Sequence, residues 1–229
     1  MLTDIDDTRT TDGAITPDAL EALAQLKAAG LHVIPITGRP VGWSEPFARV
    51  WPVDAIVAEN GAVALIPDDL NKNGLQRPPH ERKQLSKIYQ QAAATRAANF
   101  SRMQCVLAQI EATVPGARRA QDSAGRECDI AIDHSEFTQL PQADIDRCVA
   151  LMRAAGMNAT VSSIHINGST NDQRMFEHFT HSVGVANIAR FVPQLDHLPR
   201  YITPSARGAG FAELARCLLA ARAGSTRRA

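Results

Sequence analysis

A strand–helix–strand pattern near the start of the chain limits its possible folds more than any other feature. The apolar segment 1–3 is followed by a predicted helix, which begins at Thr16–Pro17 and ends at Gly30. Its expected buried stripe consists of Leu20, Leu23 and Leu26. A second apolar segment, 31–36, comes next. Strands joined in this way lie parallel with a right-handed crossover. The pattern therefore predicts an α/β, Rossmann-like core with a parallel sheet, in which the ends of the two strands lie side by side.

Acidic residues follow the first strand, at the end where open α/β sheets place their ligand chemistry. An acidic run is usually a solvated surface. Alternate acids at a strand end, such as Asp4 and Asp6, can instead turn toward one Mg²⁺ ion, which prefers carboxylate and carbonyl oxygens. A carboxylate can also be a nucleophile toward phosphorus. We therefore expect Asp4 to attack a phosphate group and Asp6 to handle the proton.

Polar loops also follow the later predicted strands. The hydroxyl of Thr37 and the amide of Gly38 can hold phosphate oxygens at the start of a helix, although Thr37 could equally cap that helix. Arg39 is either a second anion contact or a surface residue. Asn60 either faces the site or bonds its own backbone in a turn. Asp172 is the candidate second metal carboxylate, and the alternative is an acid in the first turn of a helix.

The middle of the chain has a different pattern, in which predicted helices are mixed with half-exposed strands. This mixture predicts an α+β cap inserted into the core, with core residues 1–67, cap residues 68–166 and core residues 167–229. Such a cap can cover the strand ends and choose the substrate. The predicted cap helices are 78–100, 103–114 and 141–155, and its predicted strands are 128–133 and 158–166.

Composition excludes several kinds of partner. The 229 residues have a formal net charge of zero, so nothing favours nucleic acid or an anionic membrane surface. No apolar run approaches the roughly 20 residues of a membrane helix, and the early acids argue against a secretory signal. The four scattered cysteines fit a reducing compartment, so we expect a cytoplasmic protein. The oligomeric state stays open.

Four motifs occur in a fixed order along the chain. They are DIDDT at 4–8, TGRP at 37–40, ENGA at 59–62 and STNDQRMF at 169–176. Together they resemble the haloacid dehalogenase superfamily, and more narrowly its phosphatases with an α/β (C2, type IIB) cap after the third core strand. That group includes sugar-phosphate and mannosyl-3-phosphoglycerate phosphatases. The resemblance covers nearly the whole chain, including 182–187 and 208–214.

The resemblance implies a role for each matching residue. Asp4 would be the nucleophile that forms an aspartyl-phosphate, and Asp6 the general acid and base. Thr37 would hold the phosphate. Mg²⁺ would be bound by the Asp4 carboxylate, the Asp6 backbone carbonyl and Asp172. The implied substrate is a small phosphorylated metabolite, with a sugar phosphate as the expected class. An acid at position 6 favours phosphate transfer over dehalogenation, because a leaving alkoxide needs a proton.

The sequence departs from the family pattern before its last metal loop. The family has a lysine there that balances charge around the phosphate, whereas the lysines of this chain all come earlier: Lys27, Lys72, Lys83 and Lys87. Gly168 stands where the family has an acid. Segment 163–168 joins 169–172 directly, although relatives have a helix and a core strand between them. We infer an internal deletion, and the short first strand suggests that residues are also missing from the start.

The departures leave alternatives open. Either the 163–166 strand fills the gap in the core sheet, or the sheet keeps exposed edges. The functional alternatives are an active phosphatase and a degenerate, catalytically impaired relative, which either binds phosphorylated ligands or Mg²⁺ without turnover or has no function. Activity is credible if Lys83, Lys87 or Arg39 reaches the phosphate. A receiver domain is disfavoured by Asp6 and by the cap-sized insert.

Overall fold

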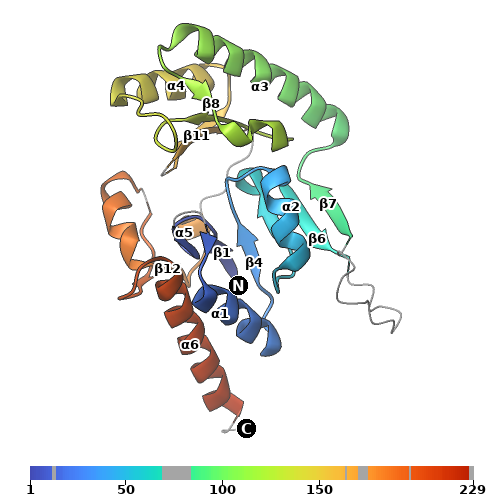
Figure 1. Cartoon of the computed structure of the whole chain (residues 1–229), viewed down its shortest axis with the longest axis vertical. Coiled ribbons are helices and arrows are strands. Elements are labelled where there is room, and N and C mark those ends of the chain that lie inside the picture. The colour runs from blue at the N-terminus through green and yellow to red at the C-terminus, as the bar shows by residue number, and fades with distance from the viewer. Residues whose placement is uncertain (12–13, 69–83, 163, 170–174, 196, 227–229) are drawn as a thin grey trace. The chain divides into compact units, whose positions relative to one another are not determined.

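The computed structural model describes residues 1–11, 14–68, 84–162, 164–169, 175–195 and 197–226 (Figure 1). By its internal contacts the chain divides into two compact units. The first unit comprises Met1–Ile36, Val50–Ala55 and Gln173–Ala229, and the second comprises Thr37–Arg49 and Ile56–Asp172. No helix within the described part of the chain is long and apolar enough to cross a membrane.

The first unit contains the predicted strand–helix–strand pattern. β1 (Leu2–Asp4) lies parallel to β4 (Ile34–Ile36) over three residue pairs. α1 (Pro17–Ala28) lies between them in the chain, and α6 (Arg207–Thr226) packs alongside α1 (Figure 1). The arrangement confirms the α/β class and the parallel pairing that the apolar segments predicted.

α1 buries a slightly different stripe from the predicted one. Its buried residues are Ala19, Ala22, Leu23 and Leu26. Leu20 is 39% exposed, so the prediction for this residue is wrong. Consecutive helical residues point about 100° apart, so Leu20 points away from the face on which its neighbour Ala19 is buried. Ala19 lies on the same face as Leu23, four residues later. A small residue at this position lets α1 pack closely.

Short elements complete the described part of the first unit. They are the antiparallel pair β2 (Thr10–Thr11) and β3 (Ala14–Ile15), α5 (Met175–His178), the 3₁₀ helix η4 (Ala186–Gln194), and the parallel pair β12 (Val183–Gly184) and β13 (Tyr201–Ile202). Among the described residues β1 is an edge strand, and β12 and β13 form a separate two-stranded sheet. An unfilled edge at β1 is one of the two outcomes expected from a deleted core strand.

The second unit begins with α2 (Val41–Val50) and an antiparallel ladder. β5 (Ile56–Ala58) is followed by the 3₁₀ helix η1 (Glu59–Gly61) and by β6 (Val63–Pro67), which pairs with both β5 and β7 (Leu85–Tyr89). β7 corrects the predicted helix over 78–100, of which 78–83 lies outside the described residues. Segment 85–89 is extended because its backbone pairs along the whole length of β6.

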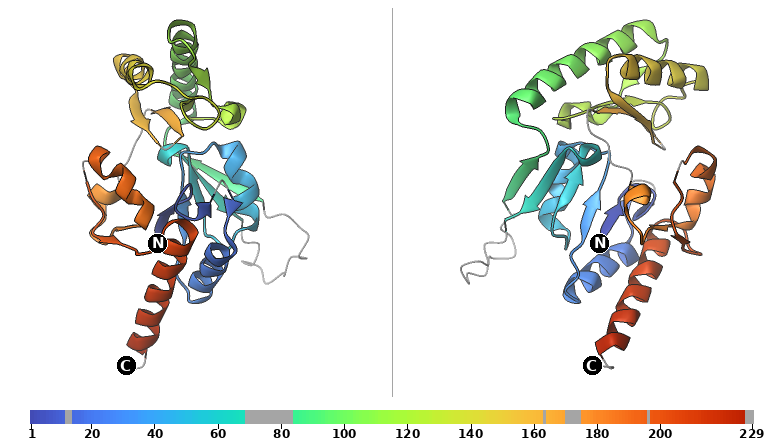
Figure 2. Two further views of the ribbon diagram at one scale, coloured as in Figure 1. Left: turned by 60° about the vertical axis from the view of Figure 1, so that its left-hand side comes forward. Right: turned by 180° about the vertical axis from the view of Figure 1, so that it is seen from behind.

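A four-stranded antiparallel sheet with two helices makes up the rest of the second unit. The sheet order is β10 (Asn158–Val161), β11 (His165–Ser169), β9 (Ile130–Asp133) and β8 (Arg118–Arg119). α3 (Ala93–Thr113) and α4 (Gln142–Ala154) lie on one face of this sheet (Figure 2). Apolar side chains of the helices and strands form one core cluster, which includes Leu107, Ile110, Ile132, Met152 and Ile166.

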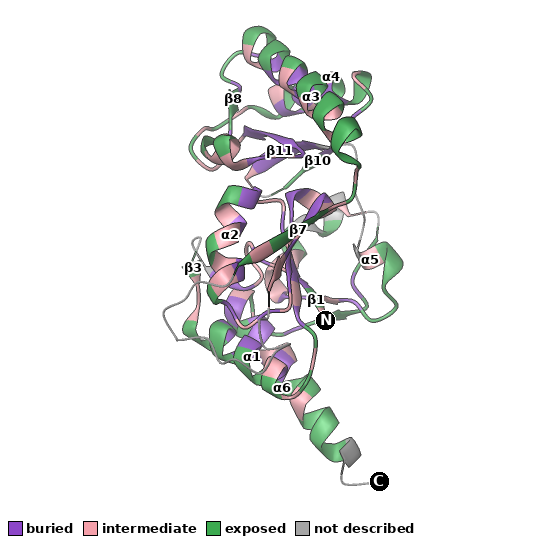
Figure 3. Cartoon of the chain, turned by 90° about the vertical axis from the view of Figure 1, so that its right-hand side faces the viewer, coloured by how far each residue is buried: buried purple, intermediate pink, exposed green. Residues whose placement is uncertain are grey.

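Two predicted elements of this region differ from the structure. The single strand expected over 158–166 is a pair of strands, β10 and β11, because Ser162 donates its backbone N–H to the carbonyl of His165 (2.8 Å) and turns the chain. α3 is one continuous helix where two were predicted. β11 is largely buried within the four-stranded sheet (Figure 3), so it does not fill a gap in the core sheet.

Candidate active site

The acidic loop after β1 is tightly closed by its own backbone. The N–H groups of Thr8, Arg9 and Thr10 all donate to the carbonyl of Ile5, at 3.3, 3.0 and 3.2 Å. Asp7 adopts a left-handed conformation with φ of 54°, which lets the chain reverse so sharply. The loop therefore presents Asp4 and Asp6 from a short, well-bonded turn.

The carboxylate of Asp4 lies at the start of the loop and is bonded within it. The hydroxyl of Thr8 donates to its Oδ2 at 3.1 Å. Burial, followed by the nearby charge of Asp6, raises the pKa of Asp4 to about 7, while Thr8, the N–H of Ile5 and Arg9 act in the opposite direction. The nearby negative charge of Asp6 disfavours ionisation of Asp4, and a cation beside Asp4 would offset this repulsion.

Asp7 ties the loop to the C-terminal part of the first unit. Its carboxylate pairs with Arg190 and, at 3.4 Å, with Nε of Arg207. Its backbone carbonyl accepts a hydrogen bond from Nδ2 of Asn187 at 2.9 Å. The sequence reasoning assigned no role to Asp7, although it stands in the same acidic run. Its contacts indicate that it orients the loop.

Arg9 is a second residue that the sequence reasoning missed. Its side chain is fully buried, and Nε donates to the backbone carbonyl of Asp4 at 3.0 Å. The guanidinium lies over the rings of Trp51 and Phe211, at 5.4 and 5.7 Å from their centroids. The sequence offers one weak signal for Arg9, which is a basic residue directly after an acidic motif. Its burial is seen only in the structure, and arginine is rarely fully buried unless it is paired.

The second unit holds the predicted phosphate loop. Thr37 is buried, its N–H donates to the carbonyl of Val57 at 2.9 Å, and its hydroxyl accepts the N–H of Arg39 at 3.0 Å. The N–H of Val41, at the start of α2, donates to Glu59 at 3.0 Å. The loop is thus fixed against β5 and η1, with the Thr37 hydroxyl held over the turn.

Asn60 and Gly38 lie against each other in this unit. Asn60 has a left-handed φ of 56°, and its Nδ2 donates to Oδ2 of Asp129 at 3.1 Å. A Cβ on Gly38 would lie 3.0 Å from Oδ1 of Asn60 and 3.6 Å from Nδ2 of Asn167. A side chain at position 38 would therefore press on two amides, which explains the glycine.

Arg39 is held by acids. Its guanidinium pairs with Glu136 at 3.1 Å and with Asp122 at 3.5 Å, and it lies 5.5 Å from the ring centroid of Trp43. Lys87 is also held, by Glu45 at 2.9 Å and Glu127 at 2.7 Å. Lys83 lies outside the described residues.

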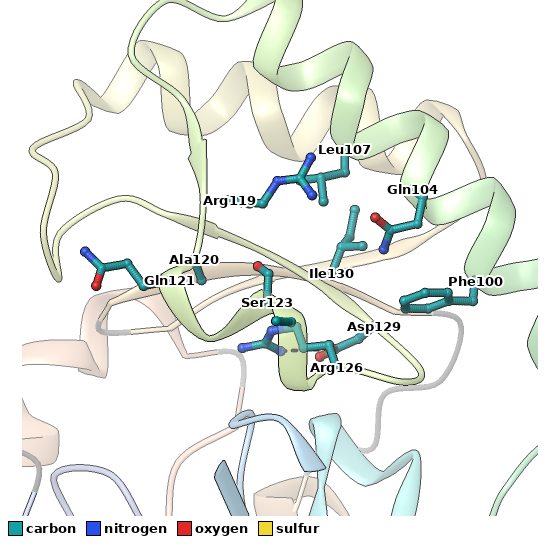
Figure 4. Close-up of a pocket in the computed structure, with 11 residues that line it drawn as sticks. Phe100, Gln104, Leu107, Arg119, Ala120, Gln121, Ser123, Arg126, Asp129 and Ile130 are labelled. Atoms are coloured by element: carbon teal, nitrogen blue, oxygen red, sulfur yellow. Dashed lines mark hydrogen bonds and ion pairs between the residues drawn. The ribbon is translucent and has the colours of Figure 1, made fainter. Parts of the chain in front are cut away.

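A hollow of about 580 Å³ lies in the second unit (Figure 4). Phe100 and Gln104 of α3 line one side, and Ser123 of η3 (Gln121–Gly125) lies opposite with Arg126. Arg126 pairs with Asp129 at 2.7 Å and donates to the carbonyl of Gly38 at 3.1 Å. One buried cation thus borders the hollow and also holds the backbone of Gly38, in the predicted phosphate loop. The size is that of a small-molecule site.

The donor set of the acidic loop fits Mg²⁺. Asp4 and Asp6 offer hard oxygen ligands, and a divalent cation would offset the repulsion that the charge of Asp6 exerts on Asp4. Asp172, the third expected ligand, lies outside the described residues. Within the residues that are described, no group of three or more His, Cys, Asp or Glu side chains gathers in a way that could hold a metal ion.

The chain thus combines an α/β unit, with an acidic loop after its first strand, and a second unit that carries an antiparallel sheet and helices. The model of the haloacid dehalogenase-like hydrolases matches residues 1–125. The chain therefore belongs to the haloacid dehalogenase-like hydrolases. This membership confirms the resemblance seen in the sequence. No curated protein sequence matches the chain.

Solved structures share the fold at low sequence identity. A protein of Thermoplasma acidophilum is 11% identical with a TM-score of 0.63, over 93% of this chain and 94% of its own. The sucrose-phosphatase of Synechocystis, solved with sucrose and phosphate, is 13% identical with a TM-score of 0.59, over 93% and 94%. A trehalose-6-phosphate phosphatase related protein is 13% identical with a TM-score of 0.56, over 98% and 100%.

Proposed function

We propose that the chain is a Mg²⁺-dependent phosphomonoester hydrolase that acts on a small phosphorylated metabolite, with sugar phosphates as the substrate class. The observation that carries the proposal is the acidic loop. Asp4 is the last residue of β1, and its carboxylate accepts a hydrogen bond from the Thr8 hydroxyl at 3.1 Å and interacts electrostatically with Asp6. Membership in the hydrolase family supports the reaction type. The fold shared with a sucrose-phosphatase supports testing sugar phosphates first.

The proposed reaction has two displacements. A carboxylate oxygen of Asp4 attacks phosphorus, the bond to the alcohol oxygen breaks, and Asp6 gives that oxygen its proton. Asp6 then takes a proton from water, which attacks the aspartyl-phosphate. The bond between phosphorus and Asp4 breaks, so inorganic phosphate leaves and the Asp4 carboxylate is restored.

The other predicted residues bind the phosphate and the metal in this proposal. The Thr37 hydroxyl and the Gly38 amide hold phosphate oxygens, with Arg39 as a further anion contact and Asn60 on the substrate side. Asp4, the Asp6 carbonyl and Asp172 would hold Mg²⁺, which when bound neutralises charge on the phosphoryl oxygens. The fixed turn at Thr37, bonded to Val57 and Asn60, supports a preorganised phosphate loop.

We also propose that residues 68–166 form the cap that selects the substrate, between core segments 1–67 and 167–229. The hollow between α3 and η3 supports this role, because it combines the apolar ring of Phe100 with the polar groups of Gln104 and Ser123. Such a mixture suits the non-phosphate part of a polar metabolite.

A binder of phosphorylated ligands without turnover is the second candidate function. One observation favours it: both lysines in the described residues are held by acids, Lys27 by Asp54 and Lys87 by Glu45 and Glu127. Neither is therefore available, as placed, to take over the charge-balancing role of the family's lysine.

Hydrolysis of an aryl phosphate by the purified chain, with and without Mg²⁺, separates the two candidates. We expect Mg²⁺-dependent release of phosphate that is lost in Asp4→Asn, because an amide cannot act as the nucleophile. The variant should keep the wild-type circular dichroism spectrum. A panel of hexose and disaccharide phosphates then defines the substrate. Turnover that persists in Asp4→Asn contradicts the mechanism, and a folded wild type without turnover favours the binder.

A further inference from the structure

Arg9 is a buried cation whose position needs an explanation. It is among the largest fully buried side chains, and moving a charge away from water is unfavourable unless partners compensate for it. Arg9 follows the acidic loop directly, and its Nε is bonded to the carbonyl of Asp4. The chain therefore keeps a positively charged side chain bonded to the backbone of its candidate nucleophile.

The contacts of Arg9 use only part of its guanidinium. The faces of Trp51 and Phe211 supply favourable cation–π contacts. Nη1 and Nη2, however, are buried without a hydrogen-bond partner among the described residues. Buried donors of this kind normally find partners. Two free donors beside an acidic loop thus point to an anionic ligand or intermediate as the missing partner.

The charge of Arg9 acts on both candidate catalytic acids. Asp4 and Asp6 each interact electrostatically with the guanidinium. The described lysines, Lys27 and Lys87, are paired with acids elsewhere. Arg9 is therefore the buried cation that the structure places at the nucleophile loop.

We propose that Arg9 supplies the fixed positive charge that balances the phosphoryl group at Asp4, in place of the lysine that this chain lacks. The inference rests on the proposed function, because it presumes that phosphate binds beside Asp4. Arg9 acts as a positioning and charge-balancing residue: it holds the Asp4 backbone through Nε and offers its remaining donors and its charge to the anion.

A charge-balancing role has a signature that damage to packing lacks. A positive charge near the loop favours an anion and disfavours a cation. Replacing Arg9 by Met keeps most of the side-chain volume and removes the charge. We expect Arg9→Met to bind orthovanadate and inorganic phosphate about tenfold or more weakly, and Mg²⁺ more tightly. Damage to the loop would weaken the binding of all of these ions.

Isothermal titration measures the affinity for the two anions, orthovanadate and phosphate, and the affinity for Mg²⁺. The proteins compared are the wild type, Arg9→Met and Arg200→Met. Arg200 is exposed in the same unit, so its variant controls for the change in net charge. In an active wild type, kcat for an aryl phosphate should fall by ~10²–10³ in Arg9→Met, as for loss of one fixed charge-stabilising group. The proposal is overturned if Arg9→Met binds the anions as tightly as the wild type does. It is also overturned if Arg9→Met loses affinity for Mg²⁺ by the same factor as for the anions.

Two further variants keep the test decisive if Arg9→Met does not fold. Arg9→Lys and Arg9→Gln both retain a long polar side chain, but only the lysine keeps the charge. We expect phosphate affinity about tenfold higher in Arg9→Lys than in Arg9→Gln, and equal affinities contradict the proposal. A wild type that binds vanadate without hydrolysing phosphate esters refutes the proposed function alone. The affinities of the variants still decide the role of Arg9.

Discussion

Glu59 is fully buried in the second unit and joins three segments of the chain through one carboxylate. It accepts the N–H groups of Val41, at the start of α2, and of Glu127 and Cys128, just before β9. Burial raises the pKa of Glu59, while these N–H groups act in the opposite direction. A carboxylate suits this position because it offers acceptors alone.

Glu59→Gln tests this interpretation. The carboxamide replaces one acceptor oxygen by an NH₂ group that faces backbone N–H donors, so buried donors lose their partner. We expect the free energy of unfolding to fall by about 2–3 kcal/mol in urea denaturation. Glu21→Gln, on the exposed face of α1, is the matched control and should change it by no more than about 0.5 kcal/mol. Equal effects of the two substitutions would show that Glu59 is not a structural acceptor.

The sequence predicts some residues of the candidate site and misses others for a physical reason. Asp4 could be found because its signal is local: acids directly after an apolar strand. The importance of Arg9 depends on Trp51 and Phe211, which are distant in the sequence. Glu59 stands inside the ENGA motif, but its partners Glu127 and Cys128 lie 68 and 69 residues further along the chain. Long-range contacts of this kind leave no periodic pattern in the sequence.

At the scale of elements, Asp54 connects the C-terminal end of α1 to the residues just before β4. Its carboxylate accepts the N–H of Val33 at 2.8 Å and interacts with Lys27 and, at 3.3 Å, with His32. Burial acts to raise the pKa of Asp54, but these three partners outweigh it, so the pKa lies below its ordinary value. The charged form therefore stabilises this junction.

The pKa of Asp54 makes a pH-dependent prediction. Since the folded pKa is below the unfolded value, the unfolded chain binds more protons in acid, and the stabilisation is present above the unfolded pKa of 3.8 and lost as pH falls below it. We expect Asp54→Asn to lower the free energy of unfolding by about 1 kcal/mol at pH 7. Urea denaturation at pH 7, 5 and 3 should show this difference shrinking at pH 3. A difference that stays constant over this range contradicts the assignment.

The elements that sequence reasoning recovered are those with a strong local pattern. β1, α1 and β4 follow from two apolar segments with a helix between them that begins at Pro17, although Thr16 makes no side-chain capping hydrogen bond. α4 (Gln142–Ala154) matches its predicted range closely. β7 was wrongly predicted as helix, because its extended form depends on pairing with β6, which no local signal reveals. Tertiary pairing overrode the weak local preference of this polar segment.

At the scale of the whole molecule, strand pairing leaves β1 at the edge of its sheet in the described residues. Among these same residues β12 pairs with β13 rather than with a central sheet. An unpaired strand edge is a template for association with another chain. The acidic loop at the end of β1 is held by hydrogen bonds and ion pairs of Ile5, Thr8 and Asp7.

Magnesium binding should therefore be measurable as a property of the whole molecule. A ligand that binds the folded chain alone stabilises it by mass action, by about 2.7 kcal/mol at a concentration 100 times its Kd. We expect Tm to rise with millimolar MgCl₂, to return on chelation, and not to respond to NaCl of matched ionic strength. Asp4→Asn should remove most of this rise, because it takes away the carboxylate that the acidic loop would offer to the ion. Equal Mg²⁺ shifts in the wild type and Asp4→Asn would place the ion elsewhere, and the acidic loop would then lose its role as the metal site.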